Sequence, residues 1–235
     1  MTTSVVLEID DVVKAYGGLR PLRIQRLSIV QGERVAIVGL DQVVTQVFVN
    51  LVTGATLPDA GVIKLFGRAT SSIAESQEWL ALIDRLGIVS ERVVLLEGMT
   101  PIQNLAIPFG LEIEPPPEET IGRARHLATE VRLAESTWLT PVARLGPLDH
   151  LRVRLGRALA LDPAILLLEH ISAGLSRIDV DALGTDLRAL AARRGVAIVM
   201  SSADDQLAQM VASRTLTLNA ATGRLSEGRF RLRVW

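Results

Sequence analysis

Three short apolar runs constrain most strongly what this chain can fold into. Residues 34–38, 164–168 and 196–200 are almost unbroken stretches of Val, Ile, Leu, Ala and Met. Runs of this length and composition are typical of strands buried on both faces, as in parallel sheets covered by helices. We therefore expect them to form the centre of one sheet, with residues 214–218 as a fourth strand.

Helical segments separate these strands. The spacing of apolar residues predicts helices over residues 43–53, 151–161 and 180–194, and Gly195 is a typical residue to follow the last of them. Strands that alternate with helices imply a mostly parallel sheet with helices on its faces. The chain is predicted to be α/β.

The two flanking regions differ from this pattern. Residues 5–9, 20–29 and 62–66 have the composition of strands, whereas residues 75–86 and 121–133 have helical apolar spacing. Three prolines at 115–117 make an extended linker inside this second region. We predict a single domain over 1–235 with an inserted helical subdomain at approximately 75–145.

Composition excludes several classes of function. The net charge of −1 argues against nucleic-acid binding through bulk positive potential. The absence of cysteine excludes disulfides and thiolate chemistry. No run approaches the roughly 18 apolar residues of a membrane span, and the three histidines are not spaced as a zinc site. We therefore predict no metal site and no nucleic-acid partner.

The order of several motifs resembles that of ATP-binding cassette (ABC) ATPase subunits of transporters. These motifs are GERVAIVG at 32–39, LPDAG at 57–61, LLEGMT at 95–100, RALALDPAILLL at 157–168 and SAGL at 172–175. They extend from about residue 5 to 228. The resemblance implies the P-loop NTPase-like fold of an ABC nucleotide-binding domain, with a mostly parallel core sheet, an N-terminal antiparallel β portion and an inserted helical subdomain.

The phosphate-binding loop departs from the family pattern. In GxxGxGK[ST], glycine amides surround the phosphates, the lysine reaches them, and Ser or Thr holds Mg²⁺. The corresponding run here, GLDQVVTQ at 39–46, keeps only the first glycine. We expect side chains to fill the phosphate space, and a β-branched residue at 44 to be strained if the loop needs a positive φ. The resemblance places a vestigial nucleotide site at Tyr16, Gly39, Asp41, Gln42, Thr45 and Gln46, with Tyr16 in place of the aromatic that stacks on adenine.

The remaining family motifs are also altered. The signature LSGGQ corresponds to LGPLD at 145–149, and Ser176 replaces the aspartate of the dimer-contact loop. No catalytic residue is predicted. The degenerate catalytic positions are Glu169 and His170 for the Walker B Asp-Glu pair, Ala203 for the switch histidine and Glu91 for the Q-loop glutamine.

Several of these residues have a simpler interpretation. His170 is either a relocated base or metal ligand beside Glu169, or a polar residue without a task. Tyr16 either stacks on a base or packs over Ile9 or Arg20. Three further groups have either a binding role or an ordinary structural one: the alternating arginines 20, 23 and 26, the aromatic residues Trp79, Trp138 and Phe109, and the alternating tail 229–235.

The resemblance with these losses predicts a non-catalytic structural or regulatory subunit of a membrane transporter. It would lie peripherally on the cytoplasmic face, with a permease subunit and another ABC ATPase subunit or its own copy as partners. No cofactor is expected, and ATP with Mg²⁺ is the alternative. Two other functions stay open: a soluble regulatory scaffold without a transporter, and an ATP-binding subunit with residual or rewired hydrolysis that uses Glu169, His170 and Asp41.

Overall fold

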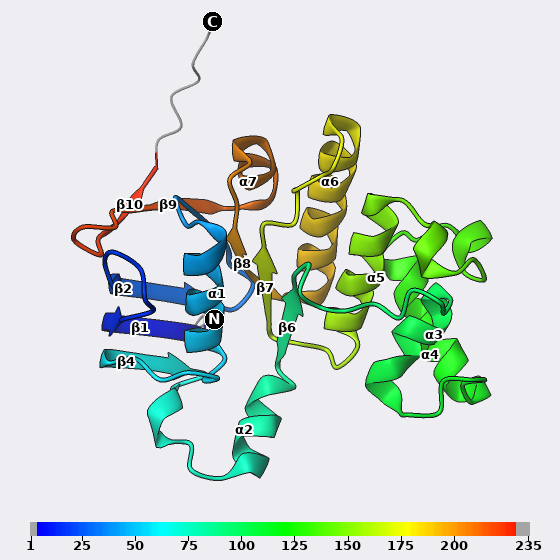
Figure 1. Cartoon of the computed structure of the whole chain (residues 1–235), viewed down its shortest axis with the longest axis horizontal. Coiled ribbons are helices and arrows are strands. Elements are labelled where there is room, and N and C mark those ends of the chain that lie inside the picture. The colour runs from blue at the N-terminus through cyan, green and yellow to red at the C-terminus, as the bar shows by residue number, and fades with distance from the viewer. Residues whose placement is uncertain (1–3, 229–235) are drawn as a thin grey trace, which may run out of the picture.

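The computed structural model describes residues 4–228, which form two β-sheets (Figure 1). The first is antiparallel, in the order β2-β1-β4-β5. Its strands are β1 (Val5–Lys14), β2 (Leu22–Val30), β4 (Ala60–Leu65) and β5 (Arg68–Ala69). The second has the order β10-β9-β3-β8-β7-β6 and is parallel except for β10. Its strands are β3 (Arg34–Val38), β6 (Leu86–Val89), β7 (Ile165–Glu169), β8 (Ala197–Ser201), β9 (Arg214–Leu218) and β10 (Leu225–Glu227).

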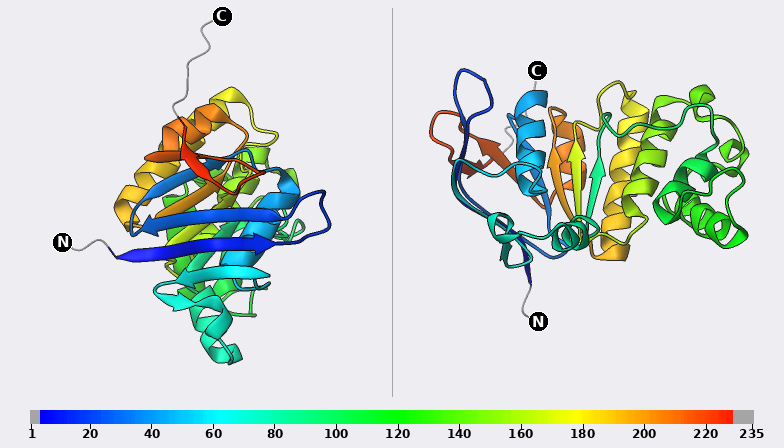
Figure 2. Two further views of the ribbon diagram at one scale, coloured as in Figure 1. Left: turned by 90° about the vertical axis from the view of Figure 1, so that its left-hand side faces the viewer. Right: turned by 60° about the horizontal axis from the view of Figure 1, so that its bottom comes forward.

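The helices cover both faces of the six-stranded sheet. They are α1 (Gln42–Val52), α2 (Ser76–Ile83), α3 (Pro101–Ala106), α4 (Glu118–Glu130), α5 (Pro147–Leu159), α6 (Arg177–Arg194) and α7 (Asp205–Val211). Helix α1 lies between the two sheets, α5 and α6 lie on the opposite face, and α3 and α4 lie beyond α5 (Figures 1 and 2). Within residues 4–228, none of these helices combines the length and the apolar character needed to span a bilayer.

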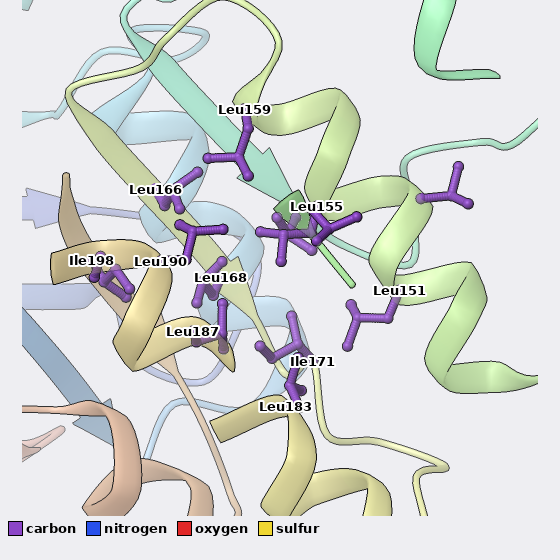
Figure 3. Close-up of a cluster of buried hydrophobic side chains, with 14 of the residues drawn as sticks. Leu151, Leu155, Leu159, Leu166, Leu168, Ile171, Leu183, Leu187, Leu190 and Ile198 are labelled. Atoms are coloured by element: carbon purple, nitrogen blue, oxygen red, sulfur yellow. The ribbon is translucent and has the colours of Figure 1, made fainter. Parts of the chain in front are cut away.

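Successive residues of the central strands point to opposite faces of the sheet and supply two apolar cores. Ile165 and Leu167 of β7 face α1 and the antiparallel sheet, whereas Leu166 and Leu168 face α5 and α6. Figure 3 shows this second core, in which leucines of α5 and α6 meet those of β7. Burial on both faces explains why the central strands are apolar throughout.

The predicted fold class is confirmed, but one segment is not. Residues 75–86 were predicted as one helix, whereas α2 ends at Ile83 and Leu86 begins β6. Strand β6 has only four residues and pairs with β7, so its identity depends on a distant partner. Glycine at position 87 lets β6 lie close to α5, because a Cβ atom there would be only 2.5 Å from the carbonyl oxygen of Ala158. Strand β6 belongs to the central sheet. The inserted helical subdomain, predicted from approximately residue 75, therefore begins after Val89.

The other boundaries moved by a few residues. Helix α4 begins at Glu118 and α5 at Pro147, earlier than the predicted 121 and 151. Helix α6 ends as predicted, with Gly195 in the left-handed conformation at φ 61°. The tail 229–235 lies outside the described residues.

One partly buried ion pair joins α4 to the end of α6. Arg194 donates to Glu130 through Nη2 at 2.6 Å and Nε at 2.8 Å, and to Asp162 through Nη1 at 3.1 Å. The hydrogen bonds from Arg194 hold the pKa of Glu130 below its usual value. The ionised carboxylate therefore stabilises the fold above the unfolded-state pKa, and this contribution is lost as pH falls through the lower pKa of the folded state.

Replacing Glu130 by glutamine should lower the free energy of unfolding by about 1–2 kcal/mol at pH 7, since a charge-assisted hydrogen bond is lost. Urea unfolding at a series of pH values measures this. The difference from wild type should shrink as pH falls below about 4.5 and vanish once Glu130 is protonated in both folded and unfolded states. A difference that stays constant down to pH 3 would contradict the account.

Candidate functional site

The candidate site lies where the carboxyl ends of β3, β6, β7 and β8 meet. In sheets of this kind, ligands bind at the edge formed by the carboxyl ends of the strands. Two adjoining cavities of about 410 and 380 Å³ open there, and Ser90, Glu91 and Glu169 line both. The smaller cavity also touches the N-terminus of α1, and the larger one the N-terminus of α5.

The N-terminus of α1 is capped by the chain itself. Gly39 follows β3 with φ 89°, a conformation that favours glycine, and brings the chain to Asp41. The Oδ1 atom of Asp41 accepts a hydrogen bond of 2.8 Å from the backbone N–H of Val44. A helix N-terminus attracts anions through such amides. Here a carboxylate of the chain occupies that position.

The expectation for residue 44 was wrong. Val44 lies inside α1, in ordinary right-handed helical conformation, so its β-branched side chain causes no strain. It packs against the apolar core between the sheets and lines neither cavity. Gln42, in contrast, is exposed and lines the smaller cavity.

Thr45 is buried and bridges three elements of the site. Its Oγ1 lies 2.7 Å from Ser201 Oγ and 3.0 Å from His170 Nε2, and the last two atoms are 3.3 Å apart. This cluster ties α1 to the ends of β7 and β8. The ring of His170 thus has a structural partner, which neither interpretation of this residue from sequence included.

Glu169 is held separately from His170. Its side chain is 8% exposed and accepts hydrogen bonds from Arg92 Nη2 at 2.6 Å, Arg92 Nε at 3.2 Å and Ser90 Oγ at 3.1 Å. A bidentate guanidinium is the strongest partner that a side chain offers a carboxylate. Over residues 4–228, no group of three or more His, Asp or Glu side chains is placed to hold a metal ion.

The structure brings together most, but not all, of the residues predicted for the site. Six of them line the smaller cavity: Asp41, Gln42, Glu91, Glu169, His170 and Ala203. Tyr16 and Gln46 line neither cavity. The ring of Tyr16 lies against Gly18 and packs on the core between the sheets. Gln46 is exposed on α1.

Sequence reasoning missed three residues of the site: Ser90, Arg92 and Ser201. Each makes a side-chain contact with a residue at least 30 positions away in the chain. The one local signal was the position of Ser90 and Arg92 on either side of Glu91, which the resemblance placed at the site.

The segment that corresponds to the signature motif in the resemblance, residues 145–149, lies at the start of α5. Pro147 is the first residue of the helix and has no amide hydrogen, so one of the free donors at this N-terminus is missing. Leu145 and Pro147 line the larger cavity. Ser176 caps α6 by accepting a hydrogen bond of 3.2 Å from the backbone N–H of Asp179.

The two sheets around α1, with helices beyond α5, define an ABC nucleotide-binding-domain fold. Solved structures have the same fold. One is cbiO1 of Clostridium perfringens, which is part of the transporter complex cbiONQ. It superimposes with a TM-score of 0.81 at 19% sequence identity, and the alignment covers 96% of this chain and 88% of that chain. The ATP-binding cassette MJ0796, in a dimeric post-hydrolysis state bound to ADP and Pi, gives 0.76 at 21% identity, covering 96% and 100%.

Sequence comparison gives the same family. The sulfate/thiosulfate import ATP-binding protein CysA 2 of Chromobacterium violaceum is 30% identical over 221 residues, 94% of this chain and 57% of the relative. The methionine import ATP-binding protein MetN of Brucella abortus (strain 2308) is 27% identical over 218 residues, 93% and 58%. No family model matches the sequence. The chain belongs to the ABC ATPase family and spans less than two thirds of the length of these relatives.

Proposed function

We propose that this chain is a non-catalytic ABC subunit, retained for its shape and its docking surfaces. One observation carries the proposal: the polar groups at the sheet edge are bonded to one another. Asp41 caps α1, Thr45 is buried between Ser201 and His170, and Arg92 neutralises Glu169. These contacts support a site whose polar groups already have hydrogen-bond or ion-pair partners within the chain and need none from a ligand.

The residues present do not fit ATP with Mg²⁺. Catalysis in this family depends on positioning the phosphates and neutralising their charge. A carboxylate stands at the helix N-terminus, and the position of the phosphate-binding lysine is a threonine that is 1% exposed. The carboxylate available for a metal ion, that of Glu169, already pairs with a guanidinium. This arrangement supports no hydrolytic step.

The partners follow from the relatives, whose names describe import ATP-binding proteins. We propose that the chain binds a permease subunit at the cytoplasmic face of a membrane, together with a second ABC subunit or its own copy. In this family, the phosphate-binding loop of one subunit faces the signature of the other. Both motifs are altered here, so the chain would weaken its own site and that of its partner.

Nucleotide binding tests this proposal directly. The melting temperature of the purified protein should not change with millimolar Mg-ATP, Mg-ADP or metal-free ATP. A comparison variant restores the family pattern with Gln42→Gly, Val44→Gly, Thr45→Lys and Gln46→Ser. Its melting temperature, measured against its own nucleotide-free value, should rise with Mg-ATP, by an amount equivalent to about 2.7 kcal/mol at 100 times the dissociation constant.

Two results would contradict the proposal. A nucleotide-dependent shift of the wild-type protein would favour an ATP-sensing subunit. Sustained Mg-ATP hydrolysis by the wild-type protein would favour the rewired enzyme. Because the wild-type measurement decides the question, a restored variant that folds poorly does not affect the conclusion.

A further inference from the structure

The irregular connection between β6 and α3, residues 90–100, is held at both ends. We call it the strap. It leaves the central sheet at Ser90 and runs to the helices beyond α5 (Figure 1). Exposed apolar side chains, Val94 at 74% and Leu96 at 38%, lie along it. Its position therefore depends on specific polar contacts and on the few side chains it buries.

At the sheet end, the contacts converge on one carboxylate. Arg92 and Ser90, both in the strap, donate to Glu169 at the end of β7. The Glu169 side chain is almost fully buried, whereas Arg92 is 40% exposed. Without the guanidinium, the buried carboxylate would have no partner of opposite charge, which is a costly state.

Two arginines of α5 hold the middle of the strap. Arg154 Nε donates to the carbonyl oxygen of Val93 at 3.1 Å, and Arg157 Nη1 donates to that of Val94 at 2.7 Å. Burial, followed by the charge of the neighbouring Arg154, lowers the pKa of Arg157. Both arginines use backbone acceptors of the strap, so a displacement of the strap would remove those acceptors.

The far end is joined to the helices by backbone and amide contacts. Leu96 donates its N–H to Asn104 Oδ1 at 2.9 Å and accepts from Asn104 Nδ2 at 3.0 Å. The N–H groups of Val142 and Ala143 donate to the carbonyl oxygens of Met99 at 2.9 Å and Glu97 at 3.0 Å. The strap therefore connects Glu169 mechanically to α3 and to the segment before α5.

We infer that the Arg92–Glu169 ion pair is a latch that keeps the strap, and through it the helices it contacts, in one fixed position against the central sheet. The latch consists of side chains of the chain itself. That the position is independent of nucleotide rests on the proposed function; the latch itself rests on the contacts alone.

Amide hydrogen exchange tests the latch. The variant Arg92→Met/Glu169→Gln removes both charges while leaving an amide that can still accept from Ser90. Exchange at Leu96, Val142 and Ala143 should become about tenfold faster than in the wild-type protein. The amides of β1 and β2, which belong to the separate antiparallel sheet, should be unchanged. A matched control, Arg68→Met/Glu78→Gln, neutralises an exposed ion pair elsewhere and should leave exchange in the strap unchanged.

Equal exchange at Leu96, Val142 and Ala143 in wild type and the folded double variant would overturn the latch. If β1 and β2 also lose protection, the double variant has unfolded, and the variant Arg92→Lys is used in its place. Lysine keeps the positive charge but lacks the bidentate guanidinium, so exchange should accelerate by an intermediate amount. An Arg92→Lys protein that exchanges like wild type would then overturn the latch. Protection of α1 amides by Mg-ATP in the wild-type protein would instead contradict the proposed function.

Discussion

Replacing Leu166 by alanine should lower the free energy of unfolding by about 2–5 kcal/mol. Leu166 lies in β7 and is completely buried against α5 and α6 (Figure 3). Truncation removes transfer free energy and leaves a cavity, because a strand with paired neighbours on both sides cannot move inward to fill it. Chemical denaturation measures the change, and the melting temperature should fall by roughly 2–4 °C for each kcal/mol.

The matched control is Leu161→Ala, which makes the same chemical change at a side chain that is 48% exposed. Its cost should be below about 1 kcal/mol, since surface substitutions rarely exceed that. Similar losses in both variants would mean that the core between β7, α5 and α6 is not the stabilising core that the structure describes.

The central sheet could be predicted from sequence because a strand that is buried on both faces consists of a continuous run of apolar residues. Strands β3, β7 and β8 each have such a run, and helices between them leave parallel pairing as the expected outcome. Strand β6 lacked this signal. Its four residues, LGIV, continue the apolar spacing of α2, and only pairing with β7 distinguishes them from another helical turn.

The site was predicted in part for a similar reason. The resemblance assigned Glu91, Glu169, His170 and Ala203 to catalytic positions, and in the structure all four line one cavity. What each side chain bonds to could not be predicted. Arg92 reaches Glu169 across 77 residues of chain, and Thr45 reaches Ser201 across 156. Such contacts leave no periodic trace in the sequence, because they depend on how two strand ends are placed side by side.

At residue 44 the sequence predicted a feature, backbone strain, that the structure does not have. Its replacement of a family glycine suggested a strained loop around a phosphate. In the structure, helix α1 begins at Gln42, two residues before Val44, and Asp41 is its N-cap. Because the helix starts there, residue 44 has right-handed helical geometry and its side chain turns to the core. A family motif thus indicated where the site lies, while the local capping residue determined its conformation.

Returning the family lysine at position 45 alone should destabilise the protein by about 3–5 kcal/mol, the cost of leaving a buried charge without a partner. Thr45 is 1% exposed, and its hydroxyl bonds to Ser201 and His170 at the ends of two central strands. The variant Thr45→Lys breaks both contacts and replaces a hydroxyl with an ammonium. Glu169, an acid at the same sheet edge, already pairs with Arg92.

The neighbouring substitution Gln46→Lys is the control. It adds the same charge to the same helix at an exposed position, so its cost should stay within about 0.5 kcal/mol. Urea unfolding of the two variants measures the difference. Equal stability would mean that the lysine at position 45 reaches the cavity and that the Thr45 cluster does not hold α1. A large difference would mean that the packing around Thr45 does not accept a lysine, so a lysine cannot be introduced at this position by a single substitution.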